Sequence, residues 1–174
     1  MEVLLGSSPR VLRPQSIAEV GNFIQISMID LRLARLIENH ADELARGLVK
    51  KIQNSERTSD FRGVPARELE IKVGEIYHHI SDWLLTKTDS DIELRFTDVG
   101  ALRAKEGISF THLLWAITLT KEHLWGFLQR EALVDRAVDL YGELQLLWLL
   151  DQFFDRAVYY TTIGYENARL AKAA

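Results

Sequence analysis

Histidines are the side chains of this sequence that could most readily do chemistry, and the adjacent pair His78 and His79 stands out. Neighbouring residues on a helix point about 100° apart, so the two rings cannot bind one metal ion from the same helix face. His79 falls near a stripe of apolar residues, whereas His78 faces outward. We interpret His79 as a histidine at the edge of the core that hydrogen-bonds to Glu75. The alternative is an iron ligand in a globin-like haem pocket.

The other titratable residues form no recognised catalytic or metal-binding motif. His112 and His123 are about 16 Å apart along a helix, too far to share a metal ion. Glu75 and His78 make one E-x-x-H pair, whereas di-iron carboxylate bundles need two such pairs and two further glutamates. The sequence has no H-E-x-x-H, G-x-S-x-G or phosphate-binding glycine motif, and it has no cysteine for thiolate chemistry or disulfides. These absences predict a protein that is not an enzyme and that holds neither a metal ion nor a cofactor.

Asp151 interrupts the most apolar stretch of the chain, residues 144–154. A buried carboxylate needs a cation beside it, and Arg103, Lys121 or a histidine could supply one, with Arg103 the expected partner. The tryptophans fall in helices that we expect at the centre of the fold, where they suit core packing. Pockets in helical domains also open between such helices. The candidates for the lining of a ligand pocket are therefore His79, Trp83, Arg103, Trp115 and Asp151.

Helices must position these residues, because apolar side chains recur at steps of three and four along nearly the whole chain after Pro14. A short first helix is expected after Ser16, which has Glu19 at the capping-box spacing. A second helix is expected from about Asp30 to Gln53. A polar loop over 54–64 follows it.

Helix boundaries are marked more clearly in the middle of the chain. Pro65 suits the first turn of a helix whose apolar stripe runs to Leu84, because a missing N–H costs nothing at that position. Ser90 and Glu93 predict a capping box at the start of the next helix, and Gly107 predicts its end. Ser109 is the expected cap of the helix that follows.

A long last helix is expected from about Leu133 to Leu170, with a bend near Gly142 or Gly164. Its stretch from Leu146 to Leu150 is apolar on every side, which is typical of a central core helix or of an oligomer interface. Two-fold dimers are the commonest way to cover such a surface, so we expect a homodimer. The interface candidates are Leu140, Leu144, Leu147, Trp148 and Phe154.

Composition and charge narrow the class of protein. A chain of 174 residues fits one domain, here an N-terminal lead-in over 1–15 and a single helical domain over 16–174. The net charge of −4 argues against nucleic-acid binding, which needs a concentrated excess of lysine and arginine. No stretch approaches the ~18 unbroken apolar residues of a membrane span, and the N-terminus has no signal-peptide pattern. We therefore expect a cytoplasmic protein that binds neither nucleic acid nor membrane.

Three stretches of the sequence carry a resemblance to a known family. They are Gly100-Ala-Leu-Arg-Ala-Lys-Glu-Gly-Ile-Ser-Phe110, Leu113-Leu-Trp-Ala-Ile117 and Lys121-Glu-His-Leu-Trp125, and Trp83-Leu84 precedes them. A pattern G-x-x-R-x-x-x-G-[IV], followed by an apolar helix that ends in Leu-Trp, resembles the N-terminal sensor domains of RsbT co-antagonist proteins. These are the RsbR and RsbRD proteins of the bacterial stressosome, and related domains precede some histidine kinases. The similarity covers roughly residues 35–130.

Two departures from the family pattern are visible. His112 stands where the family often has an acidic residue, and co-antagonists continue into a STAS output domain whereas this chain ends at Ala174. The resemblance implies a globin-like, haem-free sensor domain, commonly dimeric, that biases an output element and has no fixed ligand. On the residues alone, Gly100 allows a second helix to approach closely.

We predict an all-α fold, a globin-like or orthogonal bundle of about six helices with a long C-terminal helix. The predicted function is a non-enzymatic signalling or sensory domain of a bacterial stress response. It would act through dimerisation and its C-terminal helix, with a signalling protein as partner. Two alternatives stay open. One is a haem- or small-ligand-binding globin-like protein, and the other is a small enzyme that uses buried carboxylates or histidines without a recognised motif.

Overall fold

The computed structural model describes residues 31–131 and 137–173, and in these residues the chain forms helices and no strand. In chain order the elements are α2 (Arg32–Asn39), α3 (Ala41–Asn54), the 3-10 helix η1 (Glu56–Gly63), α4 (Ala66–His78), α5 (Ile80–Leu85), α6 (Asp89–Lys105), α7 (Phe110–Glu131) and α8 (Ala137–Ala173). The predicted all-α class and the long C-terminal helix are confirmed. The helix expected after Ser16 lies outside the described residues.

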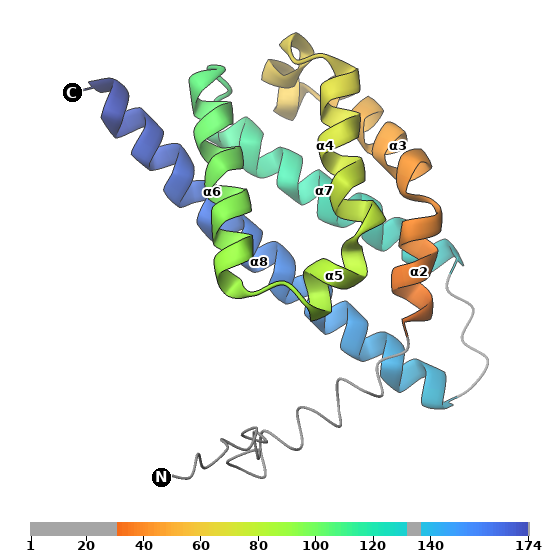
Figure 1. Ribbon diagram of the computed structural model, residues 1–174. Coiled ribbons are helices and arrows are strands. Elements are labelled where there is room, and N and C mark those ends of the chain that lie inside the picture. Colours follow the sequence, from red (N-terminus) through yellow and green to blue (C-terminus); the bar gives the residue numbers. More distant parts are fainter. Residues whose placement is uncertain (1–30, 132–136, 174) are drawn as a thin grey trace, which may run out of the picture.

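Helix α8 runs the full length of the molecule, and α6 lies across it with the most extensive contact of any helix pair (Figure 1). Helix α3 packs against α4 and η1, and α7 contacts η1, α3 and α8. A single cluster of buried apolar side chains joins these helices into one core. No helix in the described part of the chain is long and apolar enough to cross a membrane.

The helix predicted from Asp30 to Gln53 is in fact two helices, because the chain breaks at His40. There the backbone has φ −110° and ψ 14°, and the N–H of His40 bonds to the carbonyl oxygen of Ile37 at 3.1 Å. The imidazole Nδ1 lies 2.9 Å from the carbonyl oxygen of Leu36. The ring nitrogen thus contacts the carbonyl oxygen that the N–H of His40 would bind in a continuous helix.

The predicted helix that ends at Leu84 is also divided, at His79. A tertiary contact fixes the start of the second piece: Glu38 Oε1 accepts a hydrogen bond from the backbone N–H of Ser81 at 3.1 Å and another from its hydroxyl. Glu38 therefore caps the first turn of α5 from another helix, where free N–H groups need a partner. With each of these two helices in two pieces, the described residues form more helices than expected.

The segment predicted as a polar loop over 54–64 contains the helix η1. Ser55 caps it, because its hydroxyl accepts the N–H of Arg57 at 3.2 Å. Two of its side chains, Thr58 and Phe61, are buried, and the hydroxyl of Thr58 donates to the carbonyl oxygen of Ile52. The polar sequence hides this element because only two positions face the core.

Of the two predicted ends of α6, the C-terminal one is confirmed and the N-terminal one differs from the prediction. The capping box pairs Thr88 with Asp91, two residues before Ser90 and Glu93, and its hydrogen bonds measure 2.8 and 3.3 Å. Both pairs have the same spacing, and threonine is also a favoured N-cap residue, although a weaker one than serine. At the other end, Gly107 has φ 81°, so the predicted stop is confirmed as a left-handed C-terminal cap.

Helices α6 and α8 cross where glycines remove the side chains between them. A Cβ atom on Gly100 would lie 2.0 Å from the carbonyl oxygen of Thr161, and one on Gly164 would lie 2.0 Å from that of Thr97. The expected close approach at Gly100 is confirmed. Helix α8 continues through Gly164, so this glycine serves helix packing rather than a helix end.

Candidate functional site

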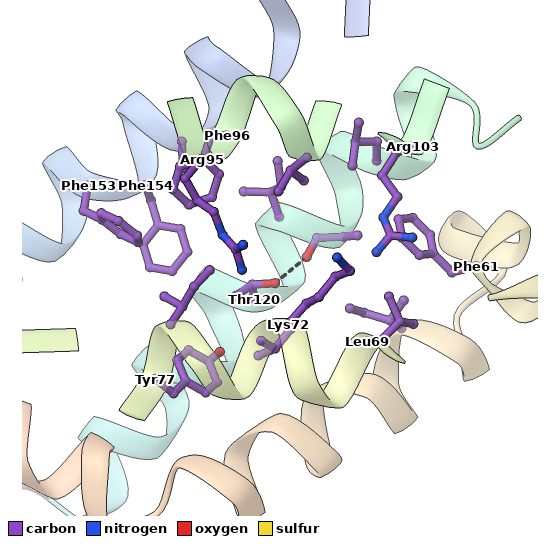
Figure 2. Close-up of a pocket in the computed structure, with 18 of the residues that line it drawn as sticks. Phe61, Leu69, Lys72, Tyr77, Arg95, Phe96, Arg103, Thr120, Phe153 and Phe154 are labelled. Carbon is purple, nitrogen blue, oxygen red and sulfur yellow. Dashed lines mark hydrogen bonds between the residues drawn. The ribbon is translucent and has the colours of Figure 1, made fainter. Parts of the chain in front are cut away.

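A cavity of about 130 Å³ lies among helices α4, α6, α7 and α8. Its walls are largely apolar, with Ile76 from α4, Val99 from α6, Ile117 from α7 and Phe154 from α8 among them. These walls exist because each helix turns an apolar stripe toward the common core. Figure 2 shows the labelled side chains of the four helices around this space.

The polar side chains at this cavity come from α4, α6 and α7, and they are Lys72, Tyr77, Arg95, Arg103 and Thr120. Tyr77 is 1% exposed, and its hydroxyl has no hydrogen-bond partner among the described residues. Burial raises the pKa of Tyr77 above its ordinary value, so the phenol stays protonated and can donate a hydrogen bond.

Two of the cations keep donor capacity to spare. Arg95 binds Glu75 through Nη2 at 2.9 Å, but its buried Nε has no partner among the described residues. Lys72 is half-buried and has no ion pair among the side chains that the structure describes. In Figure 2 both side chains extend from their helices into the space between α4 and α6.

Arg103 is the one predicted pocket residue that lines this cavity. Its buried guanidinium bonds to Glu106 at 2.5 Å, lies 3.6 Å from Glu68, and sits 5.8 Å from the centre of the Phe61 ring. The predicted pair with Asp151 is wrong. Near Arg103, α6 crosses α8 at Thr161, and Asp151 lies about 15 Å farther back along α8.

Asp151 instead forms an ion pair with Lys121, the other cation that the sequence offered. The carboxylate side chain is 51% exposed, so the pair lies at the surface and contributes little to stability. Asp151 does not line the cavity.

The remaining predicted pocket residues do not line the cavity either. His79 is exposed at the junction of α4 and α5, and Glu75, its predicted partner, binds Arg95 instead. Trp83 packs edge-on against Phe96, with ring centres 6.4 Å apart, as a core aromatic does. Trp115 is half-buried, with the guanidinium of Arg57 4.4 Å above its ring.

Histidines do not reach the cavity, and this bears on the haem alternative. All five histidines of the chain fall in the described residues, and none of them lines the cavity. A haem iron held there would have no imidazole ligand. In the described part of the chain, no group of three or more histidine, aspartate or glutamate side chains could hold a metal ion.

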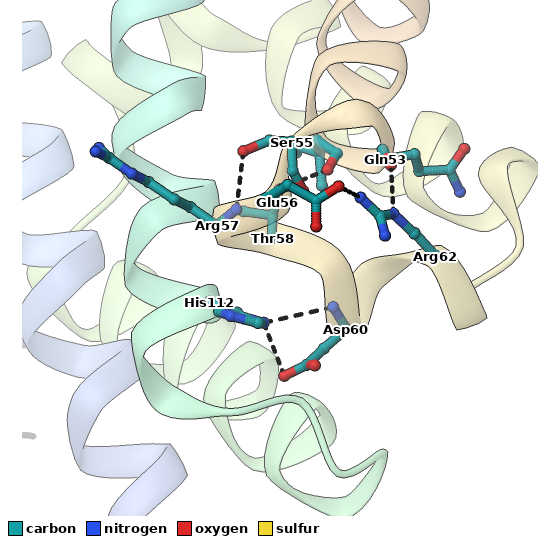
Figure 3. Close-up of polar contacts among 9 residues, drawn as sticks. Gln53, Ser55, Glu56, Arg57, Thr58, Asp60, Arg62 and His112 are labelled. Atoms are coloured by element: carbon teal, nitrogen blue, oxygen red, sulfur yellow. Dashed lines mark hydrogen bonds and ion pairs between the residues drawn. The ribbon is translucent and has the colours of Figure 1, made fainter.

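A polar cluster outside the cavity ties η1 to the start of α7 (Figure 3). Asp60 accepts the backbone N–H of Ser109 at 2.8 Å and lies 2.9 Å from Nδ1 of His112. The hydrogen bond from Ser109, and then the charge of His112, hold the pKa of Asp60 below its ordinary value. Asp60 therefore caps α7 from another element, and its contact with His112 gives this histidine a structural role at the same junction.

The outward face of α8 is a second candidate surface, and it carries exposed apolar side chains. Leu144 is 55% and Trp148 60% exposed, as expected for interface candidates, while Leu147 is half-buried. Phe154 is 5% exposed and belongs to the core, which corrects its assignment to a surface. By helical position it lies about 120° around the helix from Trp148, and its side chain lines the cavity. The side chain of Leu140 lies outside the described residues.

The sequence did not identify Lys72, Tyr77 and Arg95 as cavity residues. Tyr77 follows Val73 by four residues and precedes Ile80 by three, so the stripe alone indicates its burial. That its hydroxyl lacks a partner depends on three other helices and has no signal in the local sequence.

Comparisons with known proteins give one match. No curated protein and no solved structure matches the chain. The family model described as the RsbT co-antagonist protein rsbRD N-terminal domain matches residues 42–174, which extends the expected resemblance through α8. This family consists of regulatory co-antagonist domains of stress signalling and is not a known enzyme family. The chain therefore belongs to the RsbT co-antagonist rsbRD N-terminal domain family.

Proposed function

We propose that this regulatory domain acts as a homodimer, and that α8 both joins the two copies and carries the signal to a protein partner. The single observation that carries the proposal is the outward face of α8. Leu144, Trp148, Tyr159 and Leu170 are 55%, 60%, 62% and 70% exposed. At 100° per residue these four positions fall within about 80° of one another around the helix.

Asp155 and Glu166, both exposed, fall in the same sector of the helix, so the apolar stripe consists of separate side chains, with Leu144 and Trp148 one turn apart as its densest part. The inner face of α8 is already packed, since Leu146 and Leu150 are fully buried in the core. In the described part of the chain, the outer stripe therefore stays exposed. A two-fold pairing of the same stripe on two copies would cover both at once.

Helix α8 is also well placed to respond to the rest of the domain. The glycine crossing holds α6 against it, and Phe96 of α6 stacks on Phe153 of α8 with ring centres 5.5 Å apart. Packed interfaces of this kind change between discrete arrangements rather than deform smoothly. A shift of α6 would therefore be passed to α8 and to whatever α8 contacts.

The family description names an RsbT co-antagonist, which supports a signalling protein as the partner. The net charge of −4 gives no support to a nucleic-acid partner. Helix α8 is the element through which we expect the partner to sense the domain.

Replacement of an exposed apolar residue of the stripe by a charged one tests the proposed interface. Trp148→Glu places a charge beside Leu144 in the densest part of the stripe, and we expect a folded monomer by circular dichroism and native mass spectrometry. Leu94→Glu is the matched control, because Leu94 is 68% exposed on α6 and away from the stripe. It should stay dimeric. A dimeric Trp148→Glu, or a monomeric Leu94→Glu, would overturn the assignment of the interface to α8.

A further inference from the structure

The polar side chains that line the cavity among α4, α6, α7 and α8 are cations and hydroxyl groups, with no carboxylate among them. They are Lys72, Tyr77, Arg95, Arg103 and Thr120. Arg103 is already balanced by two carboxylates at 2.5 and 3.6 Å. Arg95 is paired with one carboxylate, and Lys72 with none among the described side chains. The cavity therefore favours a ligand that accepts hydrogen bonds and carries negative charge.

Two buried donors at the cavity lack the partner that buried polar groups normally have. They are the hydroxyl of Tyr77, a residue that is 1% exposed, and Nε of Arg95. Burial of a polar group without a hydrogen bond is costly, so such groups are rare unless a ligand or water completes them. The apolar walls of the cavity offer the hydroxyl of Tyr77 no acceptor, so a ligand that carries an acceptor could complete its hydrogen bonding.

The size and polarity of the space limit the ligand further. A cavity of about 150 Å³ lined by apolar side chains can hold a benzene molecule. The present cavity measures about 130 Å³, slightly less, so it suits a ligand of about six carbon atoms in all. Strongly hydrated anions such as phosphate would lose their water to mostly aliphatic and aromatic walls.

We propose that this cavity binds a small monocarboxylate of about six carbons in all, whose carboxylate meets Tyr77, Arg95 and Lys72. The hydrocarbon part would lie against Phe96 of α6 and Phe153 of α8, which also line the space. A bound ligand thus touches both helices that meet at the glycine crossing. Binding rests on the cavity alone, and only its effect on α8 rests on the proposed function.

Calorimetric titration of the 174-residue chain with sodium hexanoate tests the proposal. Two probes at the same concentrations act as controls: 1-hexanol has the chain without the charge, and acetate has the charge without the chain. We expect saturable binding of hexanoate and at least tenfold weaker binding of both controls, roughly the loss of one hydrogen bond to a charged group. Absence of hexanoate binding, or equal binding of hexanol, would overturn the proposal.

Two variants locate the site. Tyr77→Phe removes only the unpartnered hydroxyl, so the free protein should fold at least as well. Lys72→Met removes the unpaired charge and keeps the length of the side chain. Lys50→Met, at an exposed lysine of α3 away from the cavity, is the matched control. Weaker hexanoate binding in either cavity variant, with the control unchanged, supports the proposal. Unchanged binding in both cavity variants, or the same loss in the control, refutes it.

The molar mass of the protein in solution distinguishes a failure of the cavity proposal from a failure of the dimer proposal. A monomeric protein that binds hexanoate would support the cavity site and contradict the dimer. A dimeric protein that binds no hexanoate would support the dimer and contradict the cavity site.

Discussion

Replacement of Gly100 by alanine puts the packing of α6 against α8 to a direct test. The added Cβ would lie 2.0 Å from the carbonyl oxygen of Thr161 and 2.8 Å from the backbone nitrogen of Tyr165. Both are backbone atoms of a helix and cannot swing aside as a side chain can. Ordinary contact begins at about 3.4 Å, so the two helices must separate locally by about 1.4 Å.

The cost of this separation exceeds the gain in helix propensity. A gap of about 0.5–1 Å already forfeits a quarter to a half of the dispersion energy between packed atoms. Overpacking of a core costs about 1–3 kcal/mol and sometimes more, while alanine in place of glycine inside a helix gains about 1 kcal/mol. With two backbone clashes from one methyl group, we take the upper end of that cost, about 3 kcal/mol, and expect a net loss of about 2 kcal/mol in the free energy of unfolding.

Urea unfolding followed by circular dichroism, at equal protein concentration, measures this loss. Gly126→Ala is the matched control, because its Cβ would meet only the end of the Arg130 side chain, at 3.6 Å. That variant should be as stable as the wild type or up to about 1 kcal/mol more stable. If Gly100→Ala behaved like Gly126→Ala, the close crossing of α6 and α8 would be wrong.

Three further perturbations follow from the titratable groups. Burial, and then the charges of Lys51 and Arg130, lower the pKa of His123, so the folded state binds its proton less well than the unfolded state. Stability should fall as the pH drops below about 6.5, and His123→Gln should flatten that slope in thermal melts. Asp60→Asn should cost about 1 kcal/mol at pH 7, with the difference disappearing as acid protonates the wild-type carboxylate below pH ~3.9. Arg103→Ala should cost about 1–3 kcal/mol, since its carboxylate partners keep some contact with water, and a double-mutant cycle with Glu106→Ala should show coupling.

Local signals predicted those parts of the fold that depend on a few adjacent residues. Gly107 ends α6 because only a residue tolerant of positive φ fits that cap, and this is visible in any sequence. Gly100 likewise marks a close approach. The breaks at His40 and His79 have no such marker, because the second depends on Glu38 reaching Ser81 across 43 positions of sequence.

The sequence left open whether Arg103 and Asp151 are buried, and it did not identify the partner of Arg103. Arg103 is buried, and its partner is set by how far along α8 the two helices cross. That offset separates Arg103 from Asp151 and leaves Glu106, three residues along the same helix, as the nearest carboxylate. The cavity itself has no sequence signal, since its space arises from the fit of four helices. Only after these helices are placed do Lys72, Tyr77 and Arg95 come together.

The molar mass of the unmodified protein in solution tests the central claim most directly. Light scattering over a wide range of concentration should give about 40 kDa, twice the 20.0 kDa of one chain, with no decline on dilution into the low micromolar range. A mass of about 20 kDa at every concentration would leave the outward face of α8 without a second copy and would contradict the proposed dimer.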